Sequence, residues 1–174
     1  MDQTPYVVAV AITVGVVACV WDIRTRRIPN LLTFGSAAAA LIYHGATGGL
    51  AGLFDSMGGW LVGALLFAPM FLLGGMGAGD VKLLAALGAW LGPWSGLWVG
   101  VYSSVAGGVF AVIAALTTGY LRQALRNVWL LLAHWRVSGP RPVEGITLDT
   151  AAGPRLAYAV PILAGLLVTV WLGS

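Results

Sequence analysis

The charged residues of this chain are few, and they divide it into long uncharged stretches. Only 9% of the 174 residues are Asp, Glu, Lys or Arg, whereas about 25% is typical of a soluble domain. The uncharged stretches cover residues 3 to 21, 28 to 54, 56 to 79, 83 to 121 and 156 to 174. Because a helix needs roughly 20 mainly apolar residues to cross a bilayer, each stretch is long enough for a crossing. The pattern predicts a polytopic membrane protein.

The longest uncharged stretch predicts two crossings. It has 39 residues and contains the run Gly92-Pro93-Trp94-Ser95-Gly96, where proline and glycine interrupt a helix. We therefore expect an all-α protein with six transmembrane helices, folded as one integral-membrane domain over residues 1 to 174. The first span is not expected to be a cleavable signal peptide, because residues 1 to 4 carry no positive charge and more spans follow. The predicted spans cover residues 5 to 22, 29 to 47, 57 to 74, 80 to 96, 97 to 120 and 156 to 173.

The basic residues all fall on one side of this topology. They are Arg24, Arg26, Arg27, Lys82, Arg122, Arg126, Arg136, Arg141 and Arg155. The opposite side has Asp2 and Asp55 and no lysine or arginine, so the positive-inside rule places the basic loops in the cytoplasm and both termini outside. We expect a multi-pass protein of the cytoplasmic (inner) membrane. Anionic lipid accounts for basic residues beside the spans, so no nucleic-acid partner is predicted.

The segment from about 121 to 155 is predicted to be cytoplasmic. Residues 121 to 137 place Arg122, Arg126 and other polar residues on one helical arc and Leu125, Val128 and other apolar residues on another. This pattern is typical of an amphipathic helix lying in the membrane interface. Residues 138 to 154 contain Gly-Pro-Arg-Pro and predict a loop.

Two of the six acidic residues lie where predicted spans meet the cytoplasm. Asp22 ends the first span and Asp80 begins the fourth. The chain leaves the cytoplasm by the second span and returns by the third, so parity places both carboxylates at similar depth on one face. Ionisable groups at membrane depth are costly and usually mark a function. We predict that Asp22 and Asp80 form a catalytic pair.

Each aspartate also has a purely structural explanation. Asp80 can be the N-cap of the helix that follows it, although the run 74 to 79 is far richer in glycine than a cap requires and suits positive φ and close approach of a peptide. Asp22 can be an interfacial charge paired with Arg24 or Arg26. At a helix C-terminus Asp22 meets the negative end of the macrodipole and gains no backbone donors, whereas Asp80 meets a positive end. This asymmetry favours Asp80 as the base that activates water and Asp22 as the group that holds the proton.

Metal and disulfide chemistry are not indicated. The single cysteine, Cys19, lies inside the first span, so the sequence has neither a disulfide framework nor a CxxC pair. His44 and His134 have no partner at metal-ligand spacing, and each is expected to pack or to hydrogen-bond. We predict no metal and no other cofactor.

The residues around the two aspartates resemble a known family. Gly77-Ala78-Gly79-Asp80 resembles the GxGD signature of intramembrane aspartyl proteases, and its continuation Val-Lys-Leu is similar to the type IV prepilin peptidase version. Asp22 followed by Arg27-Ile28-Pro29-Asn30 is similar to the second half of that family's pattern. The resemblance covers about residues 15 to 120, with a weaker echo at 156 to 160, where Ala-Tyr stands in place of the family's Pro-Tyr. It implies catalytic roles for Asp22 and Asp80, and substrate-binding or supporting roles for Gly77, Gly79, Lys82, Arg27, Pro29 and Asn30.

This resemblance implies an aspartic endopeptidase of the membrane. Such an enzyme removes the short basic leader of a prepilin at the cytoplasmic face, just before the hydrophobic helix of the pilin, which would be the partner of this chain. Long members carry a zinc-binding cytoplasmic insertion and also methylate the new N-terminus. Only seven residues separate Asp22 from Asn30, so the chain resembles the short form of Tad/Flp pilus systems or of archaeal preflagellin peptidases. Methyl transfer is not inferred, and Lys82 or an arginine is a candidate contact for an acidic pilin residue after the cut.

Two other classes fit a chain of this composition. In a small proton- or cation-coupled transporter, Asp22 and Asp80 would bind ions, and the glycine-rich run would be a helix break. Both aspartates, however, fall at cytoplasmic span ends, and the other side has no matching acidic path. A passive membrane scaffold would not need two carboxylates at matched depth.

Overall fold

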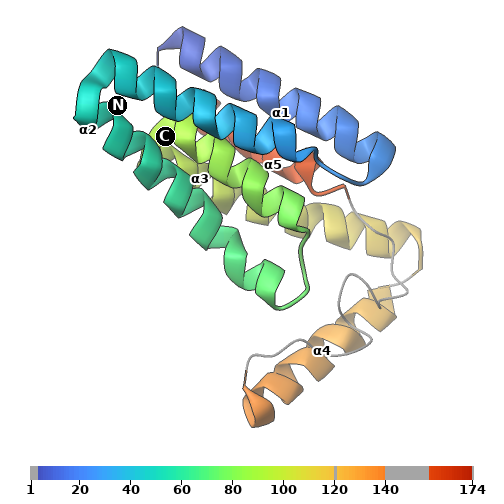
Figure 1. Ribbon diagram of the computed structural model, residues 1–174. Coiled ribbons are helices and arrows are strands. Elements are labelled where there is room, and N and C mark those ends of the chain that lie inside the picture. Colours follow the sequence, from blue (N-terminus) through green and yellow to red (C-terminus); the bar gives the residue numbers. More distant parts are fainter. Residues whose placement is uncertain (1–3, 120, 140–156, 174) are drawn as a thin grey trace.

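The computed structural model describes residues 4–119, 121–139 and 157–173, and it is all-helical in these ranges (Figure 1). This confirms the predicted all-α class. The predicted loop 138 to 154 lies almost wholly outside the described residues, as do Arg141 and Arg155. The helices are α1 (Pro5–Thr25), α2 (Asn30–Leu72), α3 (Ala78–Thr117), α4 (Leu121–Ser138) and α5 (Ala159–Leu172).

Helices α2 and α3 each fold back on themselves at a glycine. Gly49 (φ 61°, ψ −148°) interrupts α2, and Gly92 (φ 82°, ψ 173°) interrupts α3 just before Pro93. Residues eight apart in a straight helix are separated by about 12 Å, yet a Cβ on Gly96 would lie 3.1 Å from the Cα of Gly88. A Cβ on Gly52 would likewise collide with the carbonyl of His44. Each long helix is therefore a hairpin of two segments, as the colours of Figure 1 also show.

The predicted interruption in residues 92 to 96 is confirmed, but several predicted boundaries are wrong. The helix containing Asp80 begins at Ala78 and breaks at Gly92, instead of running from 80 to 96. The loop expected between residues 47 and 57 is replaced by the single non-helical residue Gly49. A glycine at positive φ reverses the chain without the longer connection that other residues need.

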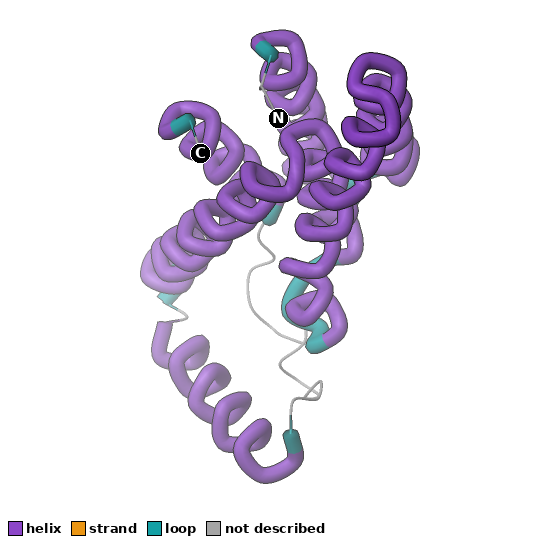
Figure 2. Tube along the Cα trace, turned by 90° about the vertical axis from the view of Figure 1, so that its left-hand side faces the viewer, coloured by secondary structure: helices purple, strands orange, loops and turns teal. Residues whose placement is uncertain are grey.

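Among the described residues, three helices (α1, α2 and α3) are long and apolar enough to cross a membrane, and α5 is a shorter apolar helix. Divided at the two glycines, the bundle has apolar segments at 5–25, 30–48, 50–72, 78–91, 93–117 and 159–172. That all of these segments cross a bilayer stays a prediction. Helix α4 is present where an amphipathic helix is expected, with Leu125, Val128 and Trp129 exposed. Its position at the cytoplasmic surface also stays a prediction, although Figures 1 and 2 show it set apart from the other helices.

The two hairpins pack through glycines that bring backbone against backbone. A Cβ on Gly59 would collide with the carbonyl of Gly88, and one on Gly63 would lie 2.8 Å from the Cα of Ala85. Residues 83 to 92, which carry this contact and also lie in the helix that packs against α5 and α1, are all buried. Small residues at helix interfaces allow such close approach in membrane proteins. The segment of α3 that carries Asp80 is therefore the centre of the bundle.

Alternation of the segments separates two ends of the bundle. The connection between α1 and α2 and the start of α3 lie at one end, which we call the site end. The turns inside α2 and α3, which fall at Gly49 and Gly92, alternate with this end and define the other, the far end. The marked N and C ends also lie there (Figure 1). Ring contacts confirm the grouping at the far end, because Tyr43 lies 5.6 Å from Tyr6 and 5.8 Å from Trp90 between ring centroids.

Candidate functional site

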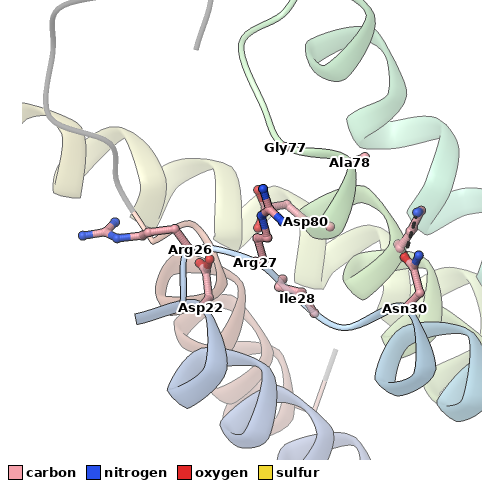
Figure 3. Close-up of a pocket in the computed structure, with 10 residues that line it drawn as sticks. Asp22, Arg26, Arg27, Ile28, Asn30, Gly77, Ala78 and Asp80 are labelled. Carbon is pink, nitrogen blue, oxygen red and sulfur yellow. Dashed lines mark hydrogen bonds between the residues drawn. The ribbon is translucent and has the colours of Figure 1, made fainter. Parts of the chain in front are cut away.

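A hollow of about 320 Å³ opens at the site end of the bundle (Figure 3). Its walls come from the end of α1, the connection that follows, the start of α2 and the start of α3. Seven of the eight site residues predicted from the sequence line it, and Pro29, the N-cap of α2, is the exception. The lining residues are Asp22, Arg26, Arg27, Ile28, Asn30, Gly77, Ala78, Gly79, Asp80 and Lys82.

Asp22 lies in the last turn of α1 and is 7% exposed. Helix α1 ends at Thr25, and Arg26 follows in the left-handed region with φ 53°. The backbone N–H of Ala159, the first residue of α5, donates to Oδ2 of Asp22 at 3.2 Å. The expectation that Asp22 gains no backbone donor is therefore wrong, because the N-terminus of another helix supplies one.

Asp80 lies in the first turn of α3 and is half-buried. The N-cap of this helix is Gly77, so the N-cap explanation of Asp80 is wrong. The Asp80 carboxylate instead reaches back and accepts a hydrogen bond from the Gly77 backbone, as the third residue of a capping box does. The negative charge of Asp22 acts on Asp80. The two carboxyl groups therefore interact electrostatically across the hollow.

The glycines before Asp80 serve close approach more than unusual backbone conformation. In the run 74 to 79, only Gly74 has a positive φ, of 74°. A Cβ on Gly77 would lie 3.1 Å from Oδ2 of Asp80, and one on Gly79 would lie 3.3 Å from Cβ of Ile28. Larger residues here would crowd the carboxylate or push α3 away from the connection after α1.

Lys82 ties the start of α3 to the start of α2. Its Nζ donates to Oδ1 of Asn30 at 2.9 Å and lies 5.1 Å from the centroid of the Phe34 ring. The ammonium group is thereby held beside the hollow instead of extending into solvent. Its charge is available to a ligand, since neither contact supplies an anionic partner.

The hollow combines two carboxylates with three cations, Arg26, Arg27 and Lys82. Two carboxyl groups that interact can share one proton, so that one accepts a proton while the other donates. Across the described part of the chain, no group of three or more His, Cys, Asp or Glu is placed to hold a metal ion. The arrangement has the components for proton transfer to and from a bound water.

Sequence reasoning missed several contributors to this site. Arg26 was used only for topology and as a possible partner of Asp22, and Ile28 had no assigned role. Ala159 and its neighbour Tyr158 lie in the C-terminal segment from which no site was predicted. The negative charge of Asp80 acts on the Tyr158 hydroxyl. The Ala-Tyr pair at 157 to 158 was the only sequence signal there, and it does not reveal a backbone donor.

The model of the type IV leader peptidase family matches residues 9–112. The match covers more than half of the chain and includes both aspartates, so the chain belongs to this family, a family of peptidases. Helices α4 and α5 lie outside the matched residues. Comparison with curated proteins and with solved structures found no match.

Proposed function

We propose that this chain is an aspartic endopeptidase that removes the short basic leader of a prepilin, with Asp22 and Asp80 as its catalytic pair. The observation that carries the proposal is that both carboxyl groups line one hollow at one end of an apolar helix bundle. Membership of a peptidase family favours this activity over an ion transporter. The rest of the hollow offers cations and backbone, with no other acidic side chain among its lining residues.

The chemistry requires one proton on the pair. The ionised carboxylate takes a proton from water as the water oxygen attacks the scissile carbonyl carbon, and the protonated carboxyl group gives its proton to the carbonyl oxygen. When the tetrahedral intermediate collapses, the C–N bond breaks and the leaving amine takes the proton that came from water. The other carboxyl group recovers its proton from one of the two hydroxyl groups of the intermediate, and that oxygen becomes the carbonyl oxygen of the new carboxyl group. General acid–base catalysis of this kind needs both groups within reach of one reacting centre.

The sequence-based reason for making Asp80 the base and Asp22 the acid does not hold. That assignment assumed that only Asp80 meets a helix N-terminus, whereas Asp22 accepts a hydrogen bond from the first residue of α5. Asp80 accepts one from Gly77 at the start of α3. Each carboxylate therefore faces the positive end of a helix dipole, and we propose a pair that shares one proton.

The proposed orientation places the site end in the cytoplasm. Arg24, Arg26, Arg27 and Lys82 all lie at this end, which the positive-inside rule assigns to the cytoplasmic side. The leader would then be cut at the cytoplasmic face while the pilin helix stays in the bilayer. No insertion separates α1 from α2 beyond residues 26 to 29, which supports the short form of the enzyme.

The rim of the hollow suggests how substrate is held. Gly77 and Gly79 expose backbone next to Asp80, where an extended peptide can form main-chain hydrogen bonds. Arg27 and Asn30 line the same hollow. Lys82, held by Asn30, is positioned to attract an acidic residue of the pilin just after the cut, while a basic leader would be directed away from it.

Reconstitution tests the catalytic pair. The protein is placed in liposomes with candidate prepilins, and leader removal by wild type is compared with Asp22→Asn and Asp80→Asn. Asp55→Asn is the matched control, because Asp55 is the remaining aspartate of the described residues and lies in α2 away from the hollow. We expect processing by wild type and by the control, and a loss of at least about 10²-fold in the two site variants. Processing of the leader by both site variants at the wild-type rate would show that the proposed catalytic pair is wrong.

A charge swap tests the role of Lys82. Lys82→Glu should slow cleavage of a prepilin with an acidic residue just after the cut, and a prepilin with lysine at that position should restore it. A prepilin with a neutral residue there is the control and should respond little to the swap. Equal cleavage of all three substrates by Lys82→Glu would show that Lys82 does not read this charge.

A further inference from the structure

The first turn of α5 lies against the proposed catalytic pair, although α5 is outside the residues that match the family. Ala159 is fully buried, and its backbone N–H donates to the buried carboxylate of Asp22. A buried carboxylate without donors carries a large desolvation cost, and Asp22 lies at the wrong end of α1 to receive donors from its own helix. The position of Asp22 therefore depends on a group 137 residues away along the chain.

The Tyr158 ring fixes the position of the Ala159 backbone N–H. The ring packs edge-on against Phe67, with centroids 5.8 Å apart. It also fills the space above Gly107 in α3, where a Cβ would collide with the hydroxyl and lie 2.7 Å from two ring carbons. Both partners belong to the hairpins that form the centre of the bundle, so the ring connects the start of α5 to the rigid part of the fold.

The body of α5 is wedged between α1 and α3, which excludes large adjustments. A Cβ on Gly165 would collide with Ser103, and one on Gly15 in α1 would lie 3.1 Å from Leu163. Ile162 and Leu166 are fully buried. Close packing on two sides fixes the depth of the helix, so a shift at its first turn is transmitted to Asp22.

We infer that the first turn of α5 is a third component of the proposed peptidase site, in which the Ala159 N–H holds the Asp22 carboxylate and the Tyr158 ring, seated on Gly107 and Phe67, sets the depth of that N–H. The inference rests on the proposed function. Tyr158 and Ala159 are positioning groups that act through Asp22. They place one carboxyl group of the pair relative to the other.

Two neighbouring glycines provide a matched test. Gly107→Ala puts a methyl group into the Tyr158 ring, whereas Gly108→Ala places the same methyl where nothing lies within 4 Å. Leader cleavage is measured in proteoliposomes as kcat per monodisperse enzyme and as KM for the prepilin. We expect Gly107→Ala to lower kcat by about 10²-fold, the scale of a 1 Å misplacement, with KM unchanged. Gly108→Ala should equal wild type.

Substitutions of the tyrosine provide a second test that adds no volume. Tyr158→Ala removes the ring from Phe67 and should lower kcat as Gly107→Ala does, whereas Tyr158→Phe keeps the ring there and should recover most of the lost kcat. A purely structural role would reduce the yield of monodisperse protein while leaving its kcat unchanged, and that result would overturn the inference. Wild-type kcat in both Gly107→Ala and Tyr158→Ala would also overturn it.

The aspartate variants separate this inference from the proposed function. If Asp22→Asn and Asp80→Asn are inactive while Gly107→Ala and Tyr158→Ala keep wild-type kcat, the catalytic pair stands and only the role of α5 is wrong. If the aspartate variants process the prepilin, the proposed function itself fails.

Discussion

The site end and the far end of the bundle use polar groups in different ways. At the site end, Asp22, Asp80 and three basic side chains surround an open hollow. At the far end, the side chains of Ser56 and His44 contact backbone carbonyls beside the break at Gly92. Ser56 Oγ donates to the carbonyl of Ala89 at 2.8 Å, and His44 Nε2 lies 3.1 Å from the carbonyl of Trp90. The polar groups at the far end bond to backbone carbonyls inside the fold, while those at the site end line a hollow that a ligand can enter.

The chemistry of the break explains the far end. Pro93 has no N–H, so the carbonyl of Ala89 loses the partner it would have in a continuous helix. Ser56 replaces that partner, and His44 does the same one residue later. Trp90 is fixed in turn because its Nε1 donates to Ser36 Oγ at 2.9 Å. In the described residues, no buried side-chain nitrogen or oxygen lacks a hydrogen-bond partner. Substitutions should therefore affect activity at one end and stability at the other.

Loss of a site carboxylate should have the largest effect on activity and little effect on folding. Asn is isosteric with Asp, and its carbonyl can still accept from Ala159, so Asp22→Asn should keep the thermal unfolding midpoint of the wild type. Its kcat should fall by about 10²–10⁴-fold, the usual contribution of general acid–base catalysis. Calorimetry in detergent, run beside the cleavage assay, checks both quantities. A large fall in the midpoint would mean that Asp22 serves the fold first.

Close backbone packing near the far end should give the largest effect on stability. In Gly88→Ala the new methyl would collide with the carbonyl of Gly59, which cannot move away as a side chain can. We expect destabilisation of at least about 3 kcal/mol, the upper end of typical overpacking costs. Gly35→Ala is the control, because a Cβ there meets nothing within 4 Å. Chemical unfolding in detergent measures the difference, and equal stability of the two variants would contradict the proposed packing.

The hydrogen bond of His44 should have a moderate effect. His44→Ala leaves the carbonyl of Trp90 without its side-chain donor in a buried position, which should cost about 1 kcal/mol in a membrane protein. His44→Gln keeps an N–H donor and should recover part of the loss. In both variants the folded enzyme should retain wild-type kcat. A loss of kcat without a loss of stability would break the division between the two ends.

The exposed hydrogen bond at the site end should matter least for stability. Asn30→Ala removes the acceptor of Lys82, but both groups are reached by water, so the free energy of unfolding should change by less than about 0.5 kcal/mol. Leader cleavage should weaken a few-fold because Lys82 loses its fixed position. Cleavage rates at increasing prepilin concentration measure the effect on activity. Chemical unfolding of Asn30→Ala and of His44→Ala compares the loss of an exposed hydrogen bond with the loss of a buried one. A larger stability loss in Asn30→Ala than in His44→Ala would reverse the comparison.

Much of the architecture could be read from local signals. Charge spacing indicated the apolar segments, and Gly92-Pro93 indicated the break in α3, because a missing N–H and a positive φ act within one turn. Parity of the segments brought Asp22 and Asp80 to one end, and both line the same hollow. The exact residue of the turn, Gly49, was harder to predict, since Gly48-Gly49 lies in a Gly- and Ala-rich segment in which other glycines serve helix packing.

By itself the sequence determined the all-helical class, the two aspartates and most of the residues around them. These features depend on composition, spacing and neighbours in the chain. Only the tertiary structure decided that Asp22 receives a donor from Ala159 and that Lys82 is held by Asn30. Such contacts join residues far apart in sequence, and they exist because glycine contacts set how closely the helices approach and at what depth each helix lies.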